Sequence, residues 1–90
     1  MATRHATVSN DEGLHARPAE LVARTAMAHA AEVTLVRGEH RVDAKSILDL
    51  LTLGAAKGVE LVIEATGDDA EQAADAVAEL INRGFDSNAV

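Results

Sequence analysis

The chain has 90 residues, contains no cysteine, and carries a formal net charge of −7 from 8 basic and 15 acidic residues. This length fits one small domain that spans residues 1–90. The lack of cysteine excludes disulfides, thiolate metal sites and cysteine nucleophiles, and the acidic charge argues against binding to nucleic acid or anionic membranes. No apolar segment resembles a signal core or a membrane span, so we expect a cytoplasmic protein that does not insert into membranes.

The first half of the chain predicts a strand, a helix and a hairpin. Residues 4–8 alternate between apolar and polar side chains, as in a strand with one buried face. Residues 32–44 alternate in the same way around Gly38 and predict a β-hairpin that turns there. Residues 16–29, between these segments, predict a helix, because apolar side chains recur at helical spacing. They are Ala19, Val22, Ala23, Ala26, Met27 and Ala30.

The next segments predict a short element followed by a strand. Ser46 is a favourable N-cap for the apolar segment that ends at Gly54. The Asp49 side chain could in turn accept the backbone N–H of Ser46, as in an acidic capping box. The length of this segment favours a brief helix, although its periodicity also allows a buried strand. Residues 59–67 alternate cleanly and predict the last strand.

Capping signals mark both ends of the final helix. Asp68 and Glu71 predict an acidic capping box at its start, and Gly84 fits the left-handed position after its end. Phe85, the only aromatic residue, would then pack against Leu80. The element order is βαββαβα, an α+β fold with helices on one face of an antiparallel sheet. The apolar stripe of the final helix consists of Ala70, Ala73, Ala74, Val77, Leu80 and Ile81.

The segment GLHARPAEL, residues 13–21, places His15 just before the first predicted helix. Pro18 falls in the first turn, where it leaves the amides of Ala16 and Arg17 free to bind an anion. Arg17 adds a guanidinium suited to phosphate oxygens. A neutral imidazole beside such a site could attack phosphorus and later pass the phosphoryl group on, so His15 is the candidate nucleophile.

Other roles for His15 remain open at this point. A histidine before a helix can simply cap it or lie exposed. A hydrolase built on Ser46 and a histidine would need an acid and an oxyanion hole that the chain does not display. The chain has no nucleotide-binding fingerprint, and we expect no metal and no cofactor. The histidines lack the paired spacing of metal ligands, and His29 is expected to help end the first helix; they are His5, His15, His29 and His40.

GLHARPAEL together with AKSILDLLTLGAAKG, residues 44–58, resembles the two signature segments of the HPr family. These are the histidine-containing phosphocarrier proteins of the bacterial sugar phosphotransferase system, and the resemblance covers nearly the whole chain. It implies an open-faced β-sandwich with sheet order 1-4-2-3 and three helices on one face. It also implies that His15 is phosphorylated and that Arg17 stabilises the phosphate. The chain would then be a phosphoryl carrier with a phosphohistidine intermediate rather than a stand-alone turnover enzyme.

The same resemblance implies the partners. Phosphorylated enzyme I would donate the phosphoryl group, the IIA component of a sugar permease would accept it, and the carrier would act as a monomer. Ser46 matches the serine that HPr kinase/phosphorylase modifies in some lineages. The alternative is a regulatory homologue, of the nitrogen-branch or carbon-regulation type, that acts mainly by protein binding.

The short helix is too apolar to bury every side, so we expect an exposed docking patch beside His15. The patch would consist of Ile47, Leu48 and Leu51. Asp49 departs from the family pattern, in which a basic or small residue is common. A local basic rim could still come from Arg17, Arg24 and Lys45.

Overall fold

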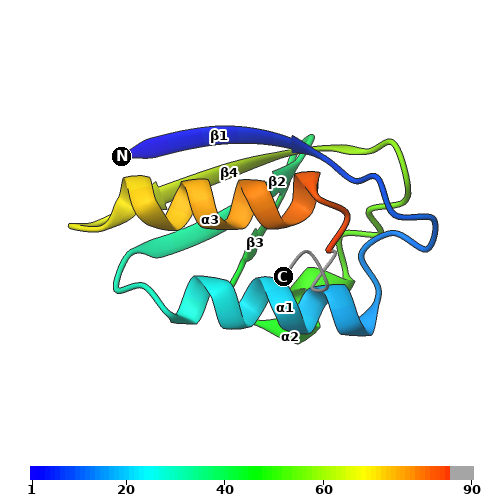
Figure 1. The fold of residues 1–90 in the computed structure, drawn as a ribbon, viewed down its shortest axis with the longest axis horizontal. Coiled ribbons are helices and arrows are strands. Elements are labelled where there is room, and N and C mark those ends of the chain that lie inside the picture. Colours follow the sequence, from blue (N-terminus) through cyan, green and yellow to red (C-terminus); the bar gives the residue numbers. More distant parts are fainter. Residues whose placement is uncertain (86–90) are drawn as a thin grey trace.

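The computed structural model describes residues 1–85, which form four strands and three helices in the order βαββαβα. The sheet is antiparallel throughout, with the strand order β1–β4–β2–β3, and the helices lie on one of its faces (Figure 1). The predicted α+β open-faced sandwich is therefore confirmed. The strands are β1 (Ala2–Thr7), β2 (Glu32–Arg37), β3 (His40–Asp43) and β4 (Glu60–Thr66), and the helices are α1 (Ala16–Met27), α2 (Ile47–Leu51) and α3 (Ala70–Asn82).

Strand β4 lies between β1 and β2 and supplies the centre of the core. Its alternate side chains Leu61, Ile63 and Ala65 are fully buried under the helices. The register places Ile63 beside Leu35 of β2, which is also fully buried. Phe85 belongs to the same core, in which aliphatic and small side chains otherwise predominate. The alternation predicted for residues 59–67 is confirmed.

Helix α1 ends at Met27 rather than at His29, and this shortens its buried stripe. The predicted positions Ala19, Val22, Ala23 and Ala26 are buried. Met27, in contrast, is 57% exposed, and Ala30 is exposed in the segment that leads to β2. The helical spacing fails at Ala30 because the chain leaves the helix before that residue, whereas Met27 is the last residue of the helix. His29 contributes to this ending as predicted, since its Nδ1 lies 3.0 Å from the Thr25 carbonyl oxygen.

The predicted capping box at Asp68 and Glu71 is wrong, because the N-cap of α3 is Asp69. The Asp69 side chain does not cap its own helix either. Its two carboxylate oxygens accept the N–H groups of Ala30 at 2.9 Å and Ala31 at 2.8 Å. These bonds tie the start of α3 to the segment between α1 and β2. The Ala30 bond is the main reason that the pKa of Asp69 is lowered.

The predicted ending of α3 is confirmed. The N–H of Phe85 donates to the carbonyl of Leu80 at 3.1 Å, and the N–H of Gly84 donates to the carbonyl of Ile81 at 3.0 Å. This pair of bonds defines a Schellman motif. Gly84 has a φ of 70° and Phe85 a φ of 64°. The motif turns Phe85 back under the helices, where it is buried.

The loop before α1 packs against the loop before β4. The Leu14 N–H donates to the Ala55 carbonyl at 2.8 Å, and the Lys57 ammonium pairs with Asp11 at 2.9 Å. Gly13 has a φ of 69°, and a Cβ on it would lie 2.4 Å from the Ala55 oxygen. Only glycine permits this approach, which fixes the segment that leads into α1.

We expect Gly13→Ala to destabilise the protein and to displace the segment before α1. The new Cβ would collide with the Ala55 oxygen, and a positive φ costs a non-glycine residue about 1–3 kcal/mol by itself. Gly38→Ala is the matched control, because Gly38 has a φ of 59° but no neighbouring atom within 4 Å of an added Cβ. Urea unfolding should show a larger loss of unfolding free energy for Gly13→Ala than for Gly38→Ala. Equal losses in the two variants would contradict the packing argument.

The Asp69 carboxylate should make the free energy of unfolding depend on pH. Its pKa is lowered on folding, so it stabilises the fold above the unfolded pKa of about 3.9, and this stability is lost as the pH falls through the lower folded value. Asp69→Asn should therefore lower the melting temperature at neutral pH and flatten its decline below about pH 4. The neighbouring Asp68→Asn serves as control in the same melting series. Superimposable pH profiles for Asp69→Asn and the unaltered chain would refute this account.

Candidate functional site

His15 is the N-cap residue of α1, but its side chain does not cap the helix. Its backbone is extended, with φ −95° and ψ −164°, and its carbonyl accepts the Ala19 N–H at 2.9 Å. The imidazole is therefore directed outward, and the side chain is 46% exposed. The simple capping role considered for His15 is excluded by this geometry.

The first turn of α1 presents backbone donors beside His15. Pro18 has no N–H, and within residues 1–85 the amides of Ala16 and Arg17 have no hydrogen-bond acceptor. Unpaired amides and the positive end of the helix dipole together form an anion site. The helix of 12 residues is long enough for that dipole to develop.

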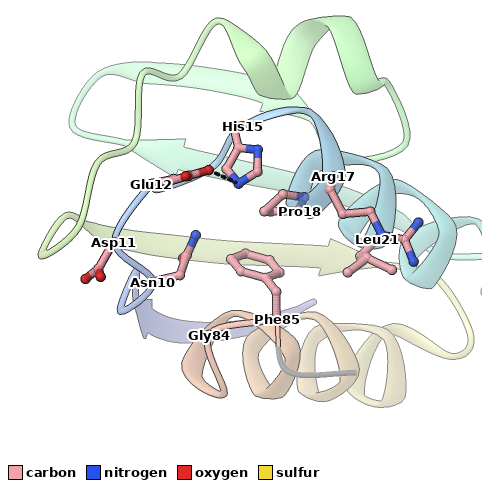
Figure 2. Close-up of a pocket in the computed structure, with 9 residues that line it drawn as sticks. All are labelled: Asn10, Asp11, Glu12, His15, Arg17, Pro18, Leu21, Gly84 and Phe85. Carbon is pink, nitrogen blue, oxygen red and sulfur yellow. Dashed lines mark ion pairs between the residues drawn. The ribbon is translucent and has the colours of Figure 1, made fainter. Parts of the chain in front are cut away.

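A carboxylate lies against one side of the imidazole (Figure 2). Glu12 Oε1 is 3.2 Å from His15 Nε2, and the Glu12 side chain is 78% exposed. A negative charge at this position favours the imidazole tautomer that carries its hydrogen on Nε2. In the neutral ring the lone pair then lies on Nδ1, the nitrogen on the side away from Glu12.

Arg17 does not contact His15 in this structure. Its side chain extends along α1, away from the imidazole (Figure 2), and Nη1 donates to Glu20 Oε1 at 2.9 Å. The second oxygen of Glu20 lies 3.4 Å from Arg24 Nε. Two of the three cations expected in a basic rim are thus paired with one carboxylate. The third, Lys45, donates to the carbonyl of His29 at 3.0 Å.

A cavity of about 310 Å³ opens beside His15 (Figure 2). One wall is apolar and comes from α1 and from the turn after α3, with the side chains of Pro18, Leu21 and Phe85. The opposite rim is polar. The complete lining is Asn10, Asp11, Glu12, His15, Arg17, Pro18, Leu21, Gly84 and Phe85.

Ser46 caps helix α2, as predicted. Its hydroxyl accepts the Asp49 N–H at 3.2 Å. The predicted bond from the Ser46 N–H to the Asp49 side chain is wrong, because this N–H donates instead to the carbonyl of Asp43 at 3.1 Å. Ser46 is therefore engaged at a helix start in a structural role.

Helix α2 exposes the three apolar side chains that the sequence singles out. Ile47 and Leu51 are each 40% exposed and Leu48 is 77% exposed, whereas Leu50 is fully buried. Helices α1 and α2 are in contact. The apolar patch, defined as Ile47, Leu48 and Leu51, thus belongs to the helix next to α1, whose N-cap is His15.

Sequence reasoning missed the acidic residues around this site. Glu20 could have been found, because a carboxylate three residues after Arg17 on a helix is a familiar pairing distance. Glu12 lies in a loop, where spacing does not predict contacts. Gly13 is part of the first motif, but its close approach to Ala55 depends on tertiary packing, which the motif does not reveal.

Two kinds of feature are absent from residues 1–85. These residues contain no group of three or more potential ligand side chains that could hold a metal ion. None of their helices has the length and apolar character needed to cross a membrane.

Comparisons with known proteins find relatives over nearly the whole chain. The family model described as the PTS HPr component phosphorylation site matches residues 2–83. A phosphocarrier protein NPr from Shewanella violacea is 40% identical over 83 residues, which cover 92% of this chain and 91% of that protein. A phosphocarrier protein HPr from Streptomyces coelicolor is 39% identical over 87 residues, with coverage of 96% and 94%.

A solved structure supports the same relationship. The crystal structure of HPr-C-His from Thermoanaerobacter tengcongensis matches with a TM-score of 0.90 and 35% identity, and the match covers 94% of this chain and 96% of that one. It therefore shares the fold over almost the whole length. From the family model, the relatives and the shared fold, we conclude that the chain belongs to the HPr family of phosphocarriers of the phosphotransferase system.

Proposed function

We propose that this chain accepts a phosphoryl group on His15 from phosphorylated enzyme I and passes it to the IIA component of a sugar permease. The observation that carries the proposal is the exposed His15 imidazole beside the unpaired amides of Ala16 and Arg17. A reactive nitrogen and an anion site then share one helix start. We expect the carrier to act as a monomer in the cytoplasm.

The proposed step needs no cofactor. The lone pair on Nδ1 of His15 attacks phosphorus, and a new N–P bond forms while the bond from phosphorus to the donor breaks. The electron pair of the broken bond stays on the donor. The ring gains positive character, which the Glu12 carboxylate beside Nε2 stabilises. The amides of Ala16 and Arg17 are suited to the phosphoryl oxygens, and Arg17 supplies a cation after a change of its side-chain direction.

The apolar patch on α2 is the proposed docking surface for enzyme I and the IIA component. It combines 77% exposure of Leu48 with a position on the helix next to α1. A partner that covers this patch removes apolar surface from water and brings its own reactive group near His15. Ser46 borders the patch, and we propose it as the site at which a kinase could regulate docking.

A nitrogen-branch role is the second candidate. The chain is 40% identical to the NPr relative and 39% identical to the HPr relative, so sequence identity does not favour either branch. In that role the donor and acceptor would be regulatory proteins rather than parts of a sugar permease. Initial rates of phosphorylation by the enzyme I of each branch, measured side by side, distinguish the two. The cognate branch should give the faster transfer.

His15→Ala should fold normally but should accept no phosphoryl group from phosphoenolpyruvate and enzyme I. The side chain is half exposed and forms no capping bond, so the stability change should stay within about 0.5 kcal/mol. Intact mass, recorded before and after acid treatment, measures the labile phosphoryl group. His5→Ala, which removes an exposed histidine from β1, should be phosphorylated like the unaltered chain. Phosphorylation of the His15→Ala protein would disprove the proposed acceptor.

Ser46→Asp should slow transfer from enzyme I while the fold stays intact. Aspartate is as good an N-cap as serine, so the melting temperature should barely change. The new charge would border the apolar patch and oppose desolvation in the complex, which should slow transfer roughly three- to tenfold. Ser46→Asn is the matched control, since it keeps a cap without the charge. Unchanged kinetics in Ser46→Asp would mean that this surface does not dock enzyme I.

A further inference from the structure

Arg17, which the proposed function needs beside the phosphoryl group, has a different partner in this structure. Its Nη1 donates to Glu20 Oε1 at 2.9 Å across one turn of α1. A guanidinium is a planar fork with a fixed set of donor directions. While one side of that fork faces Glu20, it is turned away from His15, as Figure 2 shows for the Arg17 side chain.

We propose that Glu20 is a positioning residue that competes with the phosphoryl group for Arg17. The inference rests on the proposed function. When His15 is unmodified, Glu20 pairs with Arg17 and keeps it along the helix. When His15 carries the phosphoryl group, Arg17 leaves Glu20 and binds the phosphoryl oxygens, and it returns after onward transfer. The exchange changes no covalent bond and moves no proton.

Arg24 gives the Glu20 carboxylate a second cationic partner during this exchange. Its Nε lies 3.4 Å from Glu20 Oε2, whereas Arg17 uses Oε1. Each carboxylate oxygen therefore has its own cation, and Glu20 keeps a partner when Arg17 departs. Arg17 and Arg24 are 61% and 69% exposed, so neither pair is locked by burial. Exposed pairs of this kind stabilise weakly and exchange readily.

The competition would affect how strongly the carrier retains its phosphoryl group. A cation bound to the phosphoryl oxygens favours the phosphorylated state, and a carboxylate that draws this cation away favours release. Glu20 would therefore shift the transfer equilibrium toward the partner. Its position three residues after Arg17 makes it a tuning residue of the carrier that does not touch the reacting atoms.

The test is the phosphoryl-transfer equilibrium between enzyme I and four forms of this chain. The forms are the unaltered chain, Glu20→Gln, Arg17→Ala and the double variant. Glu20→Gln keeps the side-chain shape but removes the charge, so it should shift the equilibrium toward the phosphorylated carrier about two- to fivefold, the size expected from an exposed ion pair. In the Arg17→Ala background the same substitution should have no effect, because no cation is left to compete for.

Two further measurements separate this role from a general effect on the helix. Glu79→Gln is the matched control, since Glu79 forms an exposed pair at 2.8 Å with Arg83, the C-cap residue of α3, and does not line the cavity. It should leave the equilibrium unchanged. Side-chain nitrogen signals of Arg17 in NMR spectra should move when His15 is phosphorylated, since the guanidinium changes partner.

An unchanged equilibrium in Glu20→Gln would overturn the inference. A shift of the same size in the Arg17→Ala background would also overturn it, because Glu20 would then act directly on the phosphoryl group. Failure of the unaltered chain to accept a phosphoryl group on His15 would overturn the proposed function and this inference together. Normal phosphorylation with no Glu20 effect would overturn the inference alone.

Discussion

The contact between Gly13 and Ala55 is the constraint on which the candidate site depends. The loop before α1 approaches the loop before β4 so closely that a Cβ on Gly13 would lie 2.4 Å from the Ala55 oxygen, and the Leu14 N–H bonds to that same oxygen. His15 follows directly, so its place at the start of α1 is set by this contact. The two motifs of the sequence thus serve one purpose, since the second supports the loop that carries the first.

The fold could be predicted largely from local patterns. The alternation in β4, the helical spacing in α3 and the Schellman ending at Gly84 and Phe85 each depend on residues close in sequence, and each is confirmed. The failure at the start of α3 involves a tertiary contact. Asp69 bonds to Ala30 and Ala31, 39 and 38 residues away, and no capping rule could indicate that.

The candidate site was only partly predictable for the same reason. The motif placed His15, Pro18 and Arg17 at a helix start, and the extended backbone of His15 agrees with that placement. The directions of the side chains could not be predicted. The sequence suggested that Arg17 belongs beside the phosphate, whereas the guanidinium pairs with Glu20 on the helix surface. Surface pairs between long side chains are weak and depend on neighbours such as Arg24.

Carboxylates beside the proposed phosphoryl site look unfavourable, but Glu20 suits a carrier that must also release its phosphoryl group. Glu12 lies beside Nε2 of His15, and Glu20 holds the cation that would bind the phosphoryl oxygens. Glu20 opposes excessive stabilisation of the phosphorylated state because it draws Arg17 away, whereas Glu12 stabilises the positive character of the modified ring. A site with only cations would bind the phosphoryl group more tightly and transfer it less readily.

The most direct test of the central claim is an NMR measurement of nitrogen–phosphorus coupling in the phosphorylated protein with labelled histidines. The account predicts coupling of phosphorus to Nδ1 of His15, the nitrogen on the side away from Glu12. Coupling to Nε2 of His15 would contradict the role given to Glu12. Coupling to His5, His29 or His40 would contradict the assignment of His15 as the phosphoryl acceptor.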